Sequence, residues 1–98
     1  MKKDLQNILA LLKEMAPFLQ QEFHVGSIEV FGSYARKNQN KKSDLDLLVT
    51  YKKTPGLLKF VELQNVLSKE LGLEVDLVMK NSIKPRLRDS ILQDSIPV

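Results

Sequence analysis

Three acidic residues stand in stretches that otherwise favour β-strands, where carboxylates are usually disfavoured. Asp44 and Asp46 are two residues apart in DLDLLVTY (residues 44–51), so on one strand they share a face, with Cα atoms about 6.5 to 7 Å apart. Mg²⁺ prefers oxygen ligands and takes one or two carboxylates, with water and substrate phosphates completing its shell. The pair therefore predicts a metal site. The alternative is a solvated edge strand whose charges block aggregation.

Asp76 lies in the middle of a third apolar stretch, VDLV at residues 75–78. A carboxylate in an apolar strand is expensive unless a partner compensates for its desolvation. A metal beside Asp76, or a proton to accept, would compensate. The alternative is that Asp76 marks the solvent face of its strand.

A glycine-serine turn precedes the acidic pair, at Phe31-Gly32-Ser33, where a β-type stretch ends and a helix can begin. Gly32 permits close approach of the backbone, Ser33 supplies a hydroxyl, and the free N–H groups of a helix start favour phosphate. The alternative for Ser33 is a plain helix N-cap. A phosphate cradle beside a carboxylate metal site is what phosphoryl or nucleotidyl transfer requires.

Gly32-Ser33, ten further residues and then Asp44-Leu45-Asp46 reproduce the GS-x10-DxD signature of the polymerase-beta-like nucleotidyltransferase superfamily. The sequence looks like its minimal nucleotidyltransferase branch, the MntA-type antitoxins paired with HEPN-domain toxins. Two segments carry the resemblance, FGSYARKNQNKKSDLDLLV at residues 31–49 and EVDLV at residues 74–78.

The resemblance implies an α/β (α+β) fold, a small mixed β-sheet backed by helices, as in the polymerase-beta palm. It implies ATP as cosubstrate and Mg²⁺, two ions, as metal. By the same resemblance Asp44 and Asp46 are metal ligands, Asp76 is the third carboxylate, and Gly32 with Ser33 forms the triphosphate-binding turn.

The resemblance also implies a partner, a HEPN ribonuclease toxin that is inactivated when AMP is placed on one of its tyrosine hydroxyls. The chain would then act as an antitoxin within a hetero-complex. The competing hypothesis is a binding module that neutralises its partner by occlusion. Transfer to an RNA end or a small antibiotic is a weaker third reading, because no acceptor-binding domain is visible.

A basic loop joins the glycine-serine turn to the acidic pair. Arg36, Lys37, Lys41 and Lys42 lie between Ser33 and Ser43 without an acid. The loop is either solvated or contacts nucleotide phosphates, and Arg36 is the best candidate because it lies closest to the turn. One departure from the family pattern is Lys37, which stands where relatives commonly carry glycine after Ala-Arg.

The elements that must position these residues follow from periodicity and punctuation. We expect a helix at residues 3–22 with a kink or restart at Pro17, a single helical turn that begins at Ser33, a helix at 57–71 that ends at Gly72, and a last helix after Pro85. We expect strands at residues 27–31, 44–51 and 73–79. Ile83, Leu87 and Ile91 share one face of the last helix, which we expect to pack on the sheet. A partner-binding use of that face is the alternative.

Composition limits the other possibilities. Ninety-eight residues predict a single domain, residues 1–98, and a net charge of +3 does not identify a ligand. With no Cys and one histidine, His24, thiolate chemistry and multi-histidine zinc centres are excluded, and His24 is expected to be structural or exposed. We expect a cytoplasmic protein with neither a membrane span nor direct nucleic-acid binding. Tyr34 and Tyr51 are expected to pack, with self-modification left open.

Overall fold

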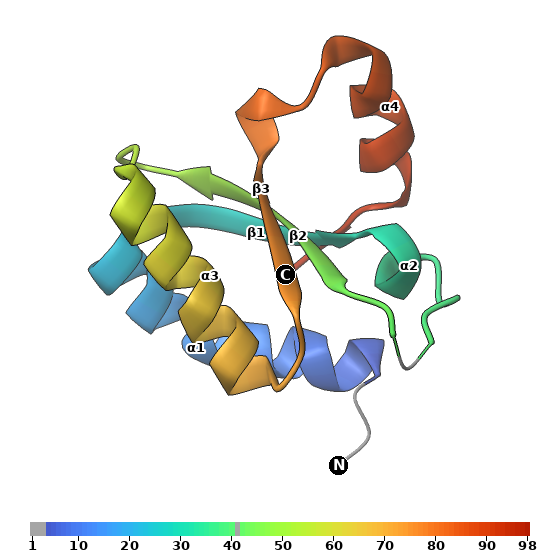
Figure 1. Cartoon of the computed structure of the whole chain (residues 1–98), viewed down its shortest axis with the longest axis horizontal. Coiled ribbons are helices and arrows are strands. Elements are labelled where there is room, and N and C mark those ends of the chain that lie inside the picture. The colour runs from blue at the N-terminus through green and yellow to red at the C-terminus, as the bar shows by residue number, and fades with distance from the viewer. Residues whose placement is uncertain (1–3, 41) are drawn as a thin grey trace.

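The computed structural model describes residues 4–40 and 42–98. Helices and strands alternate along most of this length (Figure 1). In chain order the elements are α1 (Leu5–Phe23), β1 (Val25–Phe31), α2 (Gly32–Ala35), β2 (Leu45–Tyr51), α3 (Leu57–Leu71), β3 (Val75–Met79), the 3-10 turn η1 (Lys80–Ser82), α4 (Pro85–Asp94) and β4 (Ile96–Pro97).

The strands in the described part of the chain form one sheet in the order β3-β2-β1-β4. β1 runs antiparallel to both β2 and β4, whereas β2 and β3 are parallel. A parallel pair needs a long crossover, and α3 supplies it between β2 and β3. The predicted small mixed sheet backed by helices is confirmed.

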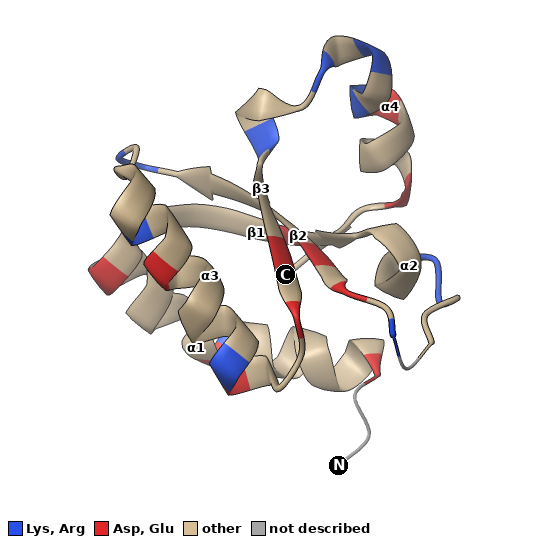
Figure 2. Ribbon diagram, viewed as in Figure 1, with Lys and Arg blue, Asp and Glu red and all other residues tan. Residues whose placement is uncertain are grey.

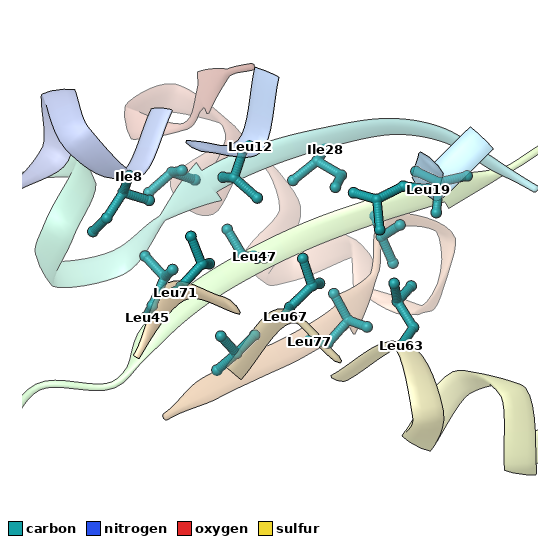
Figure 3. Close-up of a cluster of buried hydrophobic side chains, with 14 of the residues drawn as sticks. Ile8, Leu12, Leu19, Ile28, Leu45, Leu47, Leu63, Leu67, Leu71 and Leu77 are labelled. Atoms are coloured by element: carbon teal, nitrogen blue, oxygen red, sulfur yellow. The ribbon is translucent and has the colours of Figure 1, made fainter. Parts of the chain in front are cut away.

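One face of the sheet is packed against α1 and α3 and is called the packed face below. Leu45, Leu47 and Val49 of β2 point into it because side chains alternate along a strand, and all three are buried. Apolar side chains from both helices complete the core, among them Ile8, Leu12, Leu19, Leu63, Leu67 and Leu71 (Figure 3). Each such side chain contributes about 1.5 to 3 kcal/mol on burial, so this layer supplies most of the fold's stability.

The opposite face, called the open face below, carries the alternate residues of the same strands. Its members are Glu29 and Phe31 of β1, Asp46 and Leu48 of β2, and Asp76 and Val78 of β3. Strand register aligns Phe31 with Asp46 and Asp76 in one row, and Glu29 with Leu48 and Val78 in the next. Leu48 is 1% exposed yet lies outside the main core cluster, so the open face has a small apolar floor of its own.

α1 runs through Pro17 as one helix, so of the two predicted alternatives, a kink or a restart, the restart is wrong. Leu12 and Leu19 on either side of the proline are both anchored in the core, which holds the two halves together. The Asp4 side chain caps the start by accepting a hydrogen bond from the Asn7 N–H at 2.9 Å. His24, which is exposed, ends the helix in the left-handed region with φ of 57°.

α3 and its glycine cap agree with the prediction, since the helix ends at Leu71 and Gly72 has φ of 67°. Side chains of α3 also protect the edge of the sheet at β3. The Ser68 hydroxyl accepts a hydrogen bond from the Val75 N–H at 3.1 Å, and the Gln64 amide oxygen accepts one from the Leu77 N–H at 3.2 Å. These bonds satisfy edge donors that would otherwise be free to pair with another chain.

Other element boundaries differ from the prediction. β1 begins at Val25 instead of Ser27, β3 begins at Val75 instead of Leu73, and β2 begins at Leu45. β4 was not predicted, because two residues that pair with β1 carry no periodicity of their own.

The predicted packing of the last helix on the sheet is wrong. Pro85 does stand in the first turn of α4, but Ile83 lies before the helix, and no residue of α4 is buried. Leu87 is 47% exposed and Ile91 is only partly covered. No helix in residues 4–40 and 42–98 has the length and apolar character needed to cross a membrane.

Candidate active site

The glycine turn lies directly against the Asp46 carboxylate. β1 ends at Phe31, whose partner across the ladder is Asp46, and Gly32 turns the chain away with φ of 75°. A Cβ at Gly32 would overlap the Asp46 carboxylate oxygen. Glycine is therefore required here both by the backbone angle and by the space that Asp46 occupies.

α2 follows at once and brings the start of a helix to the end of β1. Its N-cap is Phe31 without a side-chain hydrogen bond, so the alternative of Ser33 as N-cap is wrong. Ser33 lies inside the first turn, and Tyr34, 3% exposed, anchors that turn to the core. The first N–H groups of a helix have no partner within it, so α2 presents donors next to Asp46.

Asp46 and Asp76 face each other on the parallel strands β2 and β3, where they are register partners (Figure 2). Asp46 is half-buried, whereas Asp76 is exposed, which agrees with the alternative that Asp76 marks the solvent face of its strand. Val75 and Leu77 on either side of Asp76 are the residues that enter the core. The structure thus brings two of the three predicted carboxylates together on the solvent side of the strands.

The pKa of the Asp46 carboxyl is raised above its usual value. Burial is the largest cause, followed by the charges of Asp76 and Asp44, and a hydrogen bond to Asp76 acts in the same direction. The nearby Arg36 charge opposes these effects and lowers the pKa. A carboxylate surrounded by others is stabilised by a cation, which is the electrostatic requirement of a metal site.

Asp44 lies one residue before β2 and is exposed, so the prediction that it shares a strand with Asp46 is wrong. A polar turn holds the chain just before it. The Asn40 N–H donates to the Ser43 hydroxyl at 2.9 Å, and the Lys42 N–H donates to the Asn40 side-chain oxygen at 2.8 Å. This positioning role was not predicted, although Asn and Ser three residues apart are typical of such turns.

The carboxylates suit a Mg²⁺ ion whose shell is completed by water and phosphate, and they do not form a metal site made of protein ligands alone. In the described residues, no three His, Cys, Asp or Glu side chains converge to hold an ion. Mg²⁺ commonly takes only one or two carboxylates and completes its shell with water and phosphate. Asp46 and Asp76, with Asp44 close enough to influence the Asp46 pKa, fit that mode of binding.

Arg36 caps the end of α2 and is exposed. Since its charge reaches Asp46, it is the cation of the basic loop that belongs to the site. Lys37 adopts a positive φ of 60°, which explains why glycine suits this position in the family pattern. Lys42 is exposed, and Lys41 lies outside the described residues.

Neither tyrosine of the chain presents its hydroxyl to the site. Tyr34 is buried, and the buried Tyr51 hydroxyl has no hydrogen-bond partner within the described part of the chain. Burial also raises the pKa of Tyr51. Burial of Tyr34 and of the Tyr51 hydroxyl therefore disfavours self-modification at either tyrosine.

Residues 12–98 match a family model described as Nucleotidyltransferase domain. The chain belongs to this nucleotidyltransferase family. It is 45% identical over 97 residues to a protein of Methanocaldococcus jannaschii that is provisionally named a protein adenylyltransferase, covering 98% of this chain and 99% of that one. It is 42% identical over 94 residues to the protein adenylyltransferase MntA of Thermococcus cleftensis, covering 96% and 95%.

Solved structures agree with this nucleotidyltransferase assignment. A protein provisionally assigned as a minimal nucleotidyltransferase matches with a TM-score of 0.82 and 34% identity over 97% of this chain and 96% of that chain. A toxin-antitoxin structure with AMP-PNP matches with a TM-score of 0.69 and 26% identity, over 99% and 72%. A structure of a tri-AMPylated Shewanella oneidensis HEPN toxin in complex with an MNT antitoxin matches with a TM-score of 0.59 and 25% identity. The match covers 94% of this chain and 66% of that chain. The chain is thus a nucleotidyltransferase with the minimal fold of its family.

Proposed function

We propose that this nucleotidyltransferase is an antitoxin that transfers AMP from ATP to a tyrosine hydroxyl of a HEPN-type toxin. One observation carries the proposal: the Asp46 carboxylate lies against the Gly32 turn and opposite Asp76, so phosphate-binding and metal-binding groups share one site. The relatives named as protein adenylyltransferases and the structural match to an AMPylated HEPN toxin with its antitoxin support the reaction and the partner. The match to a toxin-antitoxin structure with AMP-PNP supports ATP as donor.

Different residues of the chain bind the triphosphate and the metal. The N–H groups of the turn at Gly32 and Ser33 bind the triphosphate, with Arg36 adding positive charge beside it. Asp44, Asp46 and Asp76 would share the Mg²⁺ ions, with one or two of these carboxylates on each ion, and the metal would neutralise charge on the phosphates. The tyrosine oxygen forms a bond to the α-phosphorus while the bond to pyrophosphate breaks.

The proton of the attacking hydroxyl has a nearby acceptor. Asp76 is exposed on the open face, so it can reach a hydroxyl that enters from solvent. The half-buried Asp46 and the N–H groups of the turn fix the donor instead. Acceleration comes from positioning and charge neutralisation, without a covalent enzyme intermediate.

The test uses the HEPN-type protein that we expect the adjacent gene to encode. The two purified proteins are incubated with ATP and Mg²⁺, and the intact mass of the partner is measured over time. We expect a gain of one or more AMP units, which requires both ATP and the metal and disappears when the partner's acceptor tyrosine is replaced by phenylalanine.

The matched variants are Asp44→Asn with Asp46→Asn, against Glu14→Gln with Glu22→Gln on α1. Both pairs remove two negative charges, but the exposed Glu14 and Glu22 lie on a helix that packs against the other face of the sheet. We expect the aspartate pair to lower the rate by at least about 100-fold and the control pair to leave it unchanged. Neutralisation of the toxin without any gain in mass would contradict catalysis and favour occlusion.

A further inference from the structure

A single carboxylate on the open face holds both ends of the segment that contains α4. Glu29 Oε2 lies 2.7 Å from Lys80 Nζ at the start of the segment, and Glu29 Oε1 accepts a hydrogen bond from the Ser95 hydroxyl at 3.0 Å at its end. The Glu29 side chain is only 14% exposed. We call residues 80–95 the α4 arch, because its two ends are fixed while its middle extends away from the sheet (Figure 1).

Little of the arch is stabilised by burial. No residue of α4 is buried, and residues 85–90 are all exposed. Ile91 and Leu92 are partly covered near the end of the helix, where α4 approaches α2 and β1. A helix of this length is marginal in water, so its place in the fold depends on the fixed ends. Such an element is suited to contact another molecule.

The exposed half of the arch is basic. Lys84, Arg86 and Arg88 occupy its beginning, and the first turn of α4 contains no acid (Figure 2). Within residues 4–40 and 42–98, none of these three side chains forms an ion pair. Arg86 and Arg88 lie in α4, Lys84 is its N-cap, and the exposed Asp89 is the acid among residues 84–90. Three cations and one acid leave this stretch with a net charge of +2, which an anionic partner would compensate.

These cations differ from Arg36 in their relation to the carboxylate site. Arg36 lowers the pKa of Asp46, whereas Lys84, Arg86 and Arg88 are not among the charges that shift it. However, the arch is anchored at Glu29, in the row of the open face next to that of Asp46 and Asp76. Because the two rows adjoin, a protein that contacts the arch can also reach the carboxylate site.

We propose that the α4 arch is a docking surface for an acidic patch on the protein that supplies the acceptor hydroxyl. This inference rests on the proposed function and names how the acceptor is recognised. Lys84, Arg86 and Arg88 attract the acidic patch, and the exposed Leu87 between them adds apolar contact. The Glu29 contacts hold this surface at a fixed place beside the carboxylates, so the bound acceptor faces the nucleotide.

The test compares two charge reversals of equal size. Arg86→Glu with Arg88→Glu changes the arch, whereas Lys52→Glu with Lys53→Glu changes an exposed turn beyond the opposite end of β2 from Asp46. The Kd for the HEPN-type partner and the kinetics of AMP transfer are measured at low and physiological salt. We expect the arch variant to raise Kd and KM at least about 10-fold with little change in kcat, and the turn variant to change both less than about twofold.

Measuring ATP binding distinguishes failure of the proposed AMP transfer from failure of the proposed docking on the α4 arch. The arch variant should bind ATP as the unchanged protein does, because its substitutions lie outside the nucleotide site. If the unchanged chain binds its partner but transfers no AMP, the proposed function fails, and the Kd comparison still decides the docking surface. If both charge reversals weaken binding equally, or neither does, docking on the arch is wrong. Competition between the partner and a short single-stranded RNA for the arch would also overturn it.

A second variant tests the role of the Glu29 contacts with Lys80 and Ser95. Glu29→Gln removes the ion pair with Lys80 and makes the chain more positive by one charge. Electrostatic attraction alone predicts tighter binding of an acidic partner, whereas loss of the fixed placement predicts weaker binding. We expect Kd to rise about threefold while circular dichroism reports a folded protein. Tighter binding would overturn the positioning role of Glu29.

Discussion

The two faces of the sheet are built from the same strands, yet they are opposite in character. Along β2, Leu45, Leu47 and Val49 enter the packed face, where α1 and α3 cover them completely. Asp46, between two of these residues, faces the other way and meets Asp76 and the Gly32 turn. Alternation along a strand thus places the core and the candidate active site one residue apart.

The difference also separates stability from chemistry. The packed face gains free energy from apolar burial, whereas on the open face burial, together with the charges of Asp76 and Asp44, raises the pKa of Asp46. Groups arranged for catalysis commonly cost stability in the free protein. Neighbouring residues on β2 should therefore respond to substitution in opposite ways.

Leu47→Ala should have the largest effect on stability. Leu47 is fully buried, so removing its side chain leaves a cavity and should cost about 2 to 5 kcal/mol of unfolding free energy. Its neighbour Asp46→Asn is the matched comparison and should lose AMP transfer without losing stability. Urea denaturation monitored by circular dichroism measures both. Equal destabilisation by the two changes would contradict the separation of the faces.

Gly32→Ala should lower both the stability of the fold and the affinity for ATP. The new Cβ would overlap the Asp46 carboxylate, and alanine is strained at the positive φ of Gly32. We expect a loss of about 1 to 3 kcal/mol in stability, together with weaker ATP binding, as measured by denaturation and calorimetry. Gly56→Ala is the control, because a Cβ there meets nothing. Unchanged ATP binding by Gly32→Ala would show that the turn does not form the nucleotide site.

Local sequence signals were sufficient for the packed face. The leucine spacing of α1 and α3 and the β-branched and leucine-rich stretch of β2 follow from side-chain burial on one face. The same reasoning failed where long-range pairing decides structure. β4 exists because Ile96 lies beside Val30, and α4 is held by Glu29, far away in sequence. No local pattern reports either contact.

The candidate site was predictable in composition but less so in geometry. Gly32, Asp46 and Asp76 do come together, and the order of glycine turn and acidic strand signalled this. Asp44 was misplaced because β2 begins one residue later than its sequence indicates. The exposure of Asp76 agrees with the solvent-face alternative, because Val75 and Leu77 alternate with it, a pattern that places a strand's polar residue in solvent.

The raised pKa of Asp46 predicts a pH dependence with a definite sign. The folded state holds the proton more tightly than the unfolded state, so ionised Asp46 destabilises the fold as pH rises through the folded pKa. Asp46→Asn should therefore raise stability at neutral pH, and this gain should vanish once pH falls below the ordinary pKa of 3.8. Denaturation curves from pH 3 to 7 measure the effect, with Asp94→Asn on α4 as control. A gain that grows on acidification would contradict the sign.

Lys37→Gly should have the smallest effect, and it tests how the basic loop leaves α2. A non-glycine residue at a φ of 60° costs about 1 to 2 kcal/mol, while glycine adds roughly 0.5 to 1 kcal/mol of unfolded-state entropy, so the net gain should not exceed about 1.5 kcal/mol. His24→Gly is the matched control, because His24 has nearly the same φ of 57° at the end of α1.

Thermal denaturation should show a similar small rise in Tm for Lys37→Gly and His24→Gly. Their activities should differ, since Lys37 directly follows Arg36, whose charge acts on Asp46, whereas His24 precedes the strand end remote from Gly32. A more flexible loop should hold the Arg36 side chain less firmly. The KM for ATP should therefore rise about twofold in Lys37→Gly and stay unchanged in His24→Gly. If both variants leave KM unchanged, the loop does not position Arg36, and the open face depends on its carboxylates and glycine turn alone.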